Sequence, residues 1–201
     1  MKSIRILFAA ALFSFSFANF AQGYQPGDIA ADFSLKNIDG KNMSLRDFKD
    51  AKGIIVIFTC NHCPFAVLYE DRIVALNNKY ASQGYPVVAI NPNDVTKEPA
   101  DSYENMQKRA KEKNFTFPYL YDDTQAIAKA YGASRTPHVY LLRKNATNFT
   151  VEFIGAIDDN AQDAGGVKER FLENAIEELK ANKAVSKKSV KAIGCTIKWK
   201  S

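Results

Sequence analysis

The sequence predicts an α/β sandwich, in which a central mixed β-sheet carries helices on both faces. First, an unbroken β-branched run at 53–59 leads directly into a helical pattern at 64–80. Second, strand and helix patterns keep alternating as far as residue 131. Third, the 201-residue chain is 46% hydrophobic and 24% charged, which is ordinary for a globular domain with a substantial core.

The first half of the domain begins with a short strand at 32–36, followed by a turn at 38–41 and a short helix near 44–48. The run at 53–59 is expected to be a strand buried on both faces. Pro64 suits the first turn of the helix that follows. That helix has an apolar side formed by Phe65, Leu68, Ile73 and Leu76.

The second half of the domain is predicted to add strands at 86–90 and 117–121, with a polar helix at 98–113 between them. A helix at 123–131 is expected to end at Gly132. Two further strands, 139–143 and 149–154, are predicted to form an antiparallel hairpin. Apolar residues spaced along 167–179 indicate a final amphipathic helix.

The chain begins with features of a secretory signal peptide, expected to span residues 1–21 with cleavage near 18–23. Lys2 and Arg5 precede an apolar run, and small residues follow it. A retained membrane anchor is the other interpretation, but the run is shorter than the ~20 residues that a spanning helix needs. We therefore expect a periplasmic or secreted protein with no stable membrane insertion after cleavage.

The remaining chain is expected to form one domain over 22–182 and a basic C-terminal tail over 183–201. From Lys180 onward there are seven lysines and no acidic residue, so the formal net charge of +5 does not describe the whole surface. Aromatic residues do not alternate with these lysines as they do on nucleic-acid-binding surfaces, so no nucleic-acid partner is expected. Ile193, Ile197 and Trp199 suggest that the end of the tail docks on the domain.

The segment Cys60-Asn61-His62-Cys63-Pro64 carries the strongest chemical signal. A helix N-terminus favours a thiolate, so the pKa of Cys60 is expected to lie below the usual value of about 8.5. Cys63 would then close a disulfide with Cys60, and a protonated His62 would stabilise the thiolate further. This chemistry needs no cofactor and no metal.

This cysteine pair has three other possible interpretations. A structural zinc site would need a second pair of ligands, which the sequence does not clearly offer. A c-type haem site would need histidine at the position of Pro64. An inert structural disulfide is also open, although a position between a strand and a helix favours redox exchange.

Thr136-Pro137 is the second signal, because it directly precedes a predicted strand. An ordinary proline at the start of a strand is the plain interpretation. Together with two cysteines at the end of a buried strand, a cis proline beside a redox site becomes the better one.

Several segments together resemble the thioredoxin superfamily and, within it, the redoxin (AhpC/TSA-related) group of peroxiredoxin-like thioredoxin-fold proteins. The segments that carry the resemblance are 58–65, 90–94, 101–106, Thr136-Pro137 and 194–200. The resemblance implies a thioredoxin-like sandwich and a cis peptide before Pro137, packed against the disulfide. It also implies that Cys60 attacks, that Cys63 resolves, and that the backbone of Thr136 binds the incoming peptide or thiol.

The sequence departs from true peroxiredoxins, whose reactive cysteine follows a Pro-x-x-x-Thr/Ser-x-x-Cys pattern. Counting back from Cys60, those two places hold Gly53 and Ile57. The leading prediction is therefore dithiol–disulfide exchange with protein thiols and an unidentified redox partner. A thiol-dependent peroxidase is one alternative. Another is a copper carrier that uses Cys60, Cys63 and His138, since soft thiolates and an imidazole suit copper(I).

Cys195 is the odd third cysteine, and the sequence leaves two roles open for it. It is either a third redox centre that exchanges with the active pair or a small buried side chain. The buried role is favoured here, because free cysteines are commonly buried and inert.

Overall fold

A computed structural model describes residues 23–201, so the predicted signal peptide lies outside the described residues. One eight-stranded mixed sheet has the order β1-β9-β8-β4-β5-β6-β2-β3, and a two-stranded sheet pairs β10 with β7. The strands are β1 (Ile29–Ala30), β2 (Leu35–Asn37), β3 (Asn42–Met43), β4 (Gly53–Phe58), β5 (Val87–Asn91), β6 (Tyr119–Tyr121), β7 (Arg135–Thr136), β8 (His138–Lys144), β9 (Phe149–Gly155) and β10 (Cys195–Thr196). The α-helices are α1 (Pro64–Tyr80), α2 (Tyr103–Glu112), α3 (Ala126–Tyr131) and α4 (Phe171–Lys180).

The centre of the large sheet is parallel and its flanks are antiparallel. β4 runs parallel to β5, and β5 runs parallel to β6, whereas β8 runs antiparallel to β4. β4 is buried along its whole length, as its continuous β-branched run predicts. The predicted hairpin is also confirmed, because β8 and β9 pair antiparallel.

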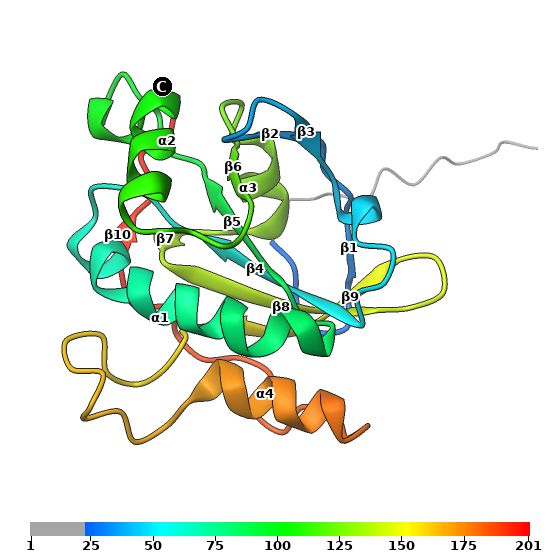
Figure 1. Ribbon diagram of the computed structural model, residues 1–201. Helices are drawn as coiled ribbons and strands as arrows, with labels where there is room; N and C mark the ends of the chain where they lie inside the picture. The colour runs from blue at the N-terminus through cyan, green and yellow to red at the C-terminus, as the bar shows by residue number, and fades with distance from the viewer. Residues whose placement is uncertain (1–22) are drawn as a thin grey trace, which may run out of the picture.

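Successive side chains of β4 enter two different cores, one on each face of the sheet. Ile55 and Ile57 pack in the cluster that contains residues of α1, α2 and α4. Ile54, Val56 and Phe58 pack in the cluster that contains residues of α3 and the N-terminal segment. Figure 1 shows α1 and α4 together in front of the sheet, with α3 on its other side. The predicted sandwich, with helices on both faces, is confirmed.

The predicted helix at 98–113 is interrupted. Pro99–Asp101 forms a short 3-10 helix, and α2 begins only at Tyr103. Ser102 is the reason, since its extended backbone breaks the helix and its side chain accepts a hydrogen bond from the Asn105 amide. This break places Asp101 where it can reach the cysteine loop.

The segment after residue 182 packs against the domain. Val185 and Ile197 are buried, and Trp199 is half-buried against the α3-side core. Figure 1 shows this segment returning behind the sheet to place β10 beside β7. Within the described residues, no helix has the length and apolar character needed to cross a membrane.

Candidate redox site

The two cysteines of the predicted motif lie in the loop between β4 and α1. Cys60 is 2% exposed and Cys63 is fully buried. α1 begins at Pro64, so Cys63 is the residue that caps it, and Cys60 lies before the first turn. The expectation that Cys60 stands at the helix N-terminus is therefore corrected: the amides of the first turn lie closer to Cys63.

Thr136 joins the two cysteines across the site. The peptide bond between Thr136 and Pro137 is cis, as the resemblance implied. The Cys60 thiol donates a hydrogen bond to Thr136 Oγ1 at 3.3 Å, and Cys63 Sγ lies 3.2 Å from the Thr136 carbonyl oxygen. Thr136 itself is fully buried. The structure thus brings together four of the predicted site residues.

Cys63 forms a disulfide with Cys195, and Cys60 is a free thiol. This differs from the expected Cys60–Cys63 pairing, and it corrects the favoured interpretation of Cys195 as a buried free thiol. The cause is the pairing of β10 with β7, which sets Cys195 opposite Thr136. The two bridged Cα atoms are then 6.0 Å apart, a usual separation for a disulfide.

The pKa of Cys60 is raised to about 11, whereas the sequence predicted a lowered value. Burial is the main cause, because it disfavours the charged thiolate, and the nearby Asp101 carboxylate acts in the same direction. The hydrogen bond with Thr136 and those from the amides of Cys63 and His62 lower the pKa of Cys60 and offset only part of this effect. In this state Cys60 is a neutral thiol at neutral pH.

Asp101 holds the cysteine loop, although it was not among the site residues predicted from the sequence. It is fully buried. Its carboxylate accepts hydrogen bonds from the Asn61 amide at 2.6 Å and from Asn93 Nδ2 at 2.7 Å, and it lies 2.6 Å from His62 Nδ1. The signal that could have found it is an acidic residue just before a polar helix, close to the loop that follows a neighbouring parallel strand.

His62 lies between two carboxylates. Besides its contact with Asp101, its Nε2 atom is 3.3 Å from Glu98 Oε2. The predicted tuning of Cys60 by a positive imidazolium is opposed by the Asp101 carboxylate, which raises the pKa of Cys60. His62 nevertheless lies close to the thiol, since ligand atoms of Cys60, His62 and Asp101 all fall within 4.8 Å of one another.

His138 does not join this group. Its ring lies against Tyr140, with centroids 4.9 Å apart, and its Nδ1 atom accepts a hydrogen bond from the Ser134 amide at 3.4 Å. Burial lowers the pKa of His138 to about 4. Because Cys63 is bridged and His138 belongs to the Tyr140 side of β8, the copper site predicted from Cys60, Cys63 and His138 is not formed.

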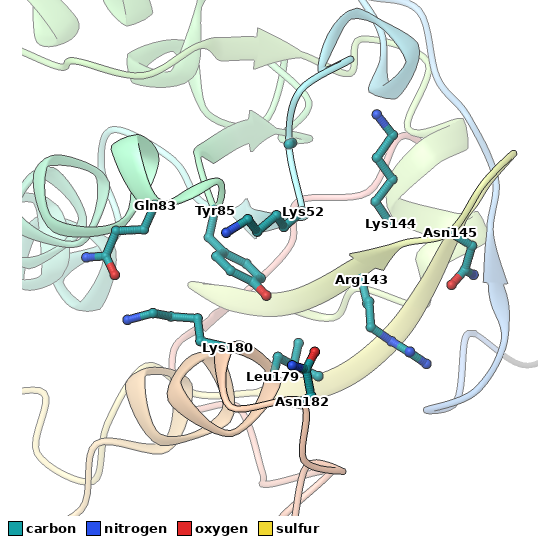
Figure 2. A pocket seen from close by; sticks show the side chains of 10 residues that line it. Lys52, Gln83, Tyr85, Arg143, Lys144, Asn145, Leu179, Lys180 and Asn182 are labelled. Carbon is teal, nitrogen blue, oxygen red and sulfur yellow. The ribbon is translucent and has the colours of Figure 1, made fainter.

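A pocket with a volume of about 800 Å³ lies at the end of the sheet opposite the redox site. Figure 2 shows its lining, which comes from the residues just before β4, the segment between α1 and β5, the end of β8 and the end of α4. Lys52, Arg143, Lys144 and Lys180 make it basic, but Arg143 and Lys180 are paired with Glu152 and Glu177. The cysteines follow the other end of β4, so this pocket is separate from the redox site.

Comparisons with known proteins identify the family of this chain. The family model described as AhpC/TSA family matches residues 26–152. The chain is 28% identical over 148 residues to the thiol-disulfide oxidoreductase ResA of Geobacillus thermodenitrificans, covering 71% of this chain and 79% of that protein. It is 26% identical to a putative peroxiredoxin of Helicobacter pylori, covering 53% of this chain and 65% of that protein.

Two solved structures share most of the chain. A conserved protein from Geobacillus kaustophilus is 39% identical, with a TM-score of 0.81 and coverage of 88% of this chain and 93% of that one. A hypothetical protein from Sinorhizobium meliloti 1021 is 35% identical, with a TM-score of 0.82 and coverage of 90% and 97%. A more distant structure, described as a thiol:disulfide interchange protein from Chlorobium tepidum, shares the fold with a TM-score of 0.53. This chain belongs to the AhpC/TSA family and has a thioredoxin-like fold.

Proposed function

We propose that the chain is an exported thiol–disulfide oxidoreductase that exchanges disulfides with protein thiols through Cys60 and Cys63. The observation that carries the proposal is the convergence of three cysteines on Thr136, one of them a thiol and two of them bridged. A structural disulfide alone would not need a buried free thiol beside it. The ResA relative is named for the same chemistry.

In the proposed reaction, Cys60 Sγ loses its proton and attacks a substrate disulfide. A mixed disulfide forms, and one substrate sulfur leaves as a thiolate. Cys63 Sγ then attacks Cys60 Sγ, which releases the second substrate sulfur and leaves a Cys60–Cys63 disulfide. The reverse sequence oxidises a substrate dithiol. Thr136 and Pro137 would orient the incoming chain beside the sulfur atoms.

The positions of the two cysteines relative to α1 support the order of attack. Cys63 is fully buried and Cys60 is 2% exposed, so neither sulfur is open in the form described here. Cys60 nevertheless lies outside α1 on the loop, whereas Cys63 is fixed at the first turn of the helix. The proposed reaction therefore requires the loop to move so that Cys60 becomes exposed, while Cys63 stays in place to resolve the mixed disulfide.

The proposed export rests on the residues that resemble a secretory signal peptide. Lys2 and Arg5, followed by the apolar run, favour export to the periplasm or the exterior. Both are oxidising compartments in which disulfides persist. Fractionation of cells that express the full chain tests this part.

Reduction of insulin by the dithiol form tests the reaction. We expect the wild type to catalyse it and both Cys60→Ser and Cys63→Ser to lose it. Cys63→Ser should also trap a mixed disulfide through Cys60. Trapping through Cys63 in the Cys60→Ser variant would reverse the assignment, and unchanged activity in both variants would refute the proposal.

Peroxide consumption, measured in the same preparations, tests the peroxidase alternative. The putative peroxiredoxin relative motivates this measurement. Gly53 and Ile57 occupy the places where peroxiredoxins carry proline and a hydroxyl, and both are buried in β4. We therefore expect peroxide consumption far slower than insulin reduction, and a faster rate would favour the alternative.

A further inference from the structure

The C-terminal segment 194–200 lies in the site as an extended peptide. It pairs antiparallel with β7, with Cys195 opposite Thr136 and Thr196 opposite Arg135. Further along, the Ile197 amide donates to the Ser134 carbonyl at 3.3 Å. The segment therefore occupies the backbone edge at which an incoming peptide is expected to bind.

The same segment is held at its far end by the loop after β5 and by the turn before α3. The Asp94 amide donates to the Lys198 carbonyl at 2.9 Å, and the Lys198 amide donates to Asn93 Oδ1 at 2.8 Å. Gln125 Nε2 also donates to the Lys198 carbonyl at 2.8 Å. These bonds fix the register of the segment independently of the disulfide.

Gly194 fits the segment closely against the cis peptide. A Cβ atom at this position would lie 2.2 Å from the Thr136 carbonyl oxygen and 3.1 Å from Pro137 N. Real Cβ atoms do not approach other atoms so closely, so only glycine allows Cys195 to reach Cys63 in this register. The chain thus presents Cys195 to the redox site as a substrate cysteine would be presented.

We propose that Cys195 is a third redox-active cysteine, and that the oxidised protein passes its disulfide from Cys60–Cys63 to Cys63–Cys195. This inference rests on the proposed function. In the step, the Cys195 thiolate attacks Cys63 Sγ, a Cys63–Cys195 bond forms, and the Cys60–Cys63 bond breaks. Cys60 leaves as a thiolate and takes up the proton that Cys195 gave up. One disulfide and one thiol are present before and after, so no external oxidant or reductant is needed.

The surroundings of the sulfur atoms support this direction. Cys60 is buried and lies near the Asp101 carboxylate, both of which favour the neutral thiol, and this thiol donates a hydrogen bond to Thr136 Oγ1. Cys195 is half-buried and is therefore the most exposed of the three cysteines. The exchange therefore regenerates Cys60 and moves the oxidised sulfur toward the surface, where a partner thiol reaches it.

Disulfide mapping after oxidation tests the relay. Reduced protein is treated with diamide, quenched with acid, alkylated and mapped by mass spectrometry at successive times. In the wild type we expect Cys60–Cys63 first and Cys63–Cys195 later, with Cys60 again free for alkylation. The Cys195→Ser variant should stop at Cys60–Cys63, and the Cys60→Ser variant should form Cys63–Cys195 without the first stage.

Gly194→Ala is a second variant, because it keeps all three cysteines while pushing β10 away from Thr136. We expect it to accumulate Cys60–Cys63, with Cys195 open to alkylation. The relay is overturned if Cys195 in the wild type stays alkylatable throughout oxidation, or if Gly194→Ala forms Cys63–Cys195 as fast as the wild type.

The two proposals fail in different ways. If Cys60→Ser and Cys63→Ser lose insulin reduction but Cys195 never enters a disulfide, only the relay is wrong. If all three serine variants reduce insulin as fast as the wild type, the proposed function itself is wrong.

Discussion

The cysteine loop at 59–63 and the C-terminal segment at 194–200 meet at Thr136, but they are held by different forces. The buried carboxylate of Asp101 contacts both Asn61 and His62 and is the only charged group within the described residues that contacts both. The C-terminal segment is fixed mainly by backbone hydrogen bonds and a disulfide. The cysteine loop thus depends on contacts with a buried charge, whereas the C-terminal segment depends on strand pairing and a covalent bond.

This difference has a chemical consequence. The negative charge that fixes the loop also disfavours the thiolate of Cys60. The segment on the other side adds no such charge at the sulfur atoms and instead supplies a bridging cysteine. Variants on the two sides should therefore have different effects. Variants of the loop side should change the pKa of Cys60, and variants of the C-terminal segment should change which disulfide forms.

Removal of the Cys63–Cys195 disulfide should have the largest effect on the free energy of unfolding. Cys63 and Cys195 are separated by 132 residues. Closing a loop of that length stabilises the folded state by about 5 kcal/mol in the chain-entropy description. We expect Cys195→Ser to lower the free energy of unfolding of the oxidised protein by an amount of this order, measured by urea denaturation. Cys60→Ser is the control, because it leaves the disulfide intact, and an equal loss in both variants would contradict the prediction.

Asp101→Asn should have the next largest effect, and on the loop side. Breaking a buried, paired charge costs about 3 kcal/mol. We also expect the pKa of Cys60 to fall below about 11, because the charge that opposes the thiolate is gone while burial remains. The pH dependence of Cys60 alkylation in the oxidised protein measures this shift.

The pH dependence of stability follows with a defined sign. The folded-state pKa of Cys60 is raised from 9.0 to about 11, so the folded state holds its proton longer than the unfolded state does. The contribution of Cys60 to the free energy of unfolding is therefore fully present below pH 9 and is lost as the pH rises toward 11. Asp101→Asn should bring the folded-state pKa of Cys60 closer to 9.0, so the pH range over which this stability is lost should become narrower. Asp123→Asn, at an exposed position, is the control and should leave the pKa of Cys60 unchanged.

With all cysteines reduced, Gly194→Ala should lower stability less than Asp101→Asn does, and it acts on the C-terminal side. Its new methyl group meets the Thr136 carbonyl, and overpacking of this kind costs about 2 kcal/mol. Trp199 is the single tryptophan of the chain, so its fluorescence reports whether the segment stays docked. Gly165→Ala lies in an exposed loop and should change neither fluorescence nor stability. A normal Trp199 signal in Gly194→Ala would show that the segment tolerates the methyl group.

Lys97→Ala should have the smallest effect. Lys97 Nζ donates to the Trp199 carbonyl at 2.6 Å across the exposed rim of the site. Surface contacts of this kind change stability by no more than about 0.5 kcal/mol. The Trp199 spectrum should shift slightly, whereas Lys111→Ala on α2 should leave it unchanged. A loss as large as that of Gly194→Ala would mean that the rim, and not the strand pairing, holds the segment.

Local sequence patterns were sufficient to predict the elements that carry the site. The β-branched run of β4 and Pro64 at the start of α1 place both cysteines in the right loop. The hairpin of β8 and β9 follows from two apolar runs around a polar turn. These features depend on neighbouring residues, which is why the sequence alone predicts them.

The disulfide and the acidity of Cys60 depend on residues far apart in the chain. Cys195 reaches Cys63 through a two-residue strand, and so short a strand has no recognisable pattern. Asp101 reaches the loop because the predicted helix breaks at Ser102. Burial of Cys60 results from all of these contacts together, so its raised pKa could not be predicted from the neighbouring residues.

The Cys63–Cys195 bond also closes a covalent ring that contains every α-helix of the described structure. The segment between β9 and α4 lies inside this ring and has many exposed residues. A protease that cuts it once therefore leaves both fragments joined, and they separate only when the bond is reduced. In a compartment that contains proteases, the oxidation state of one cysteine pair decides whether a single cut leaves one molecule or two.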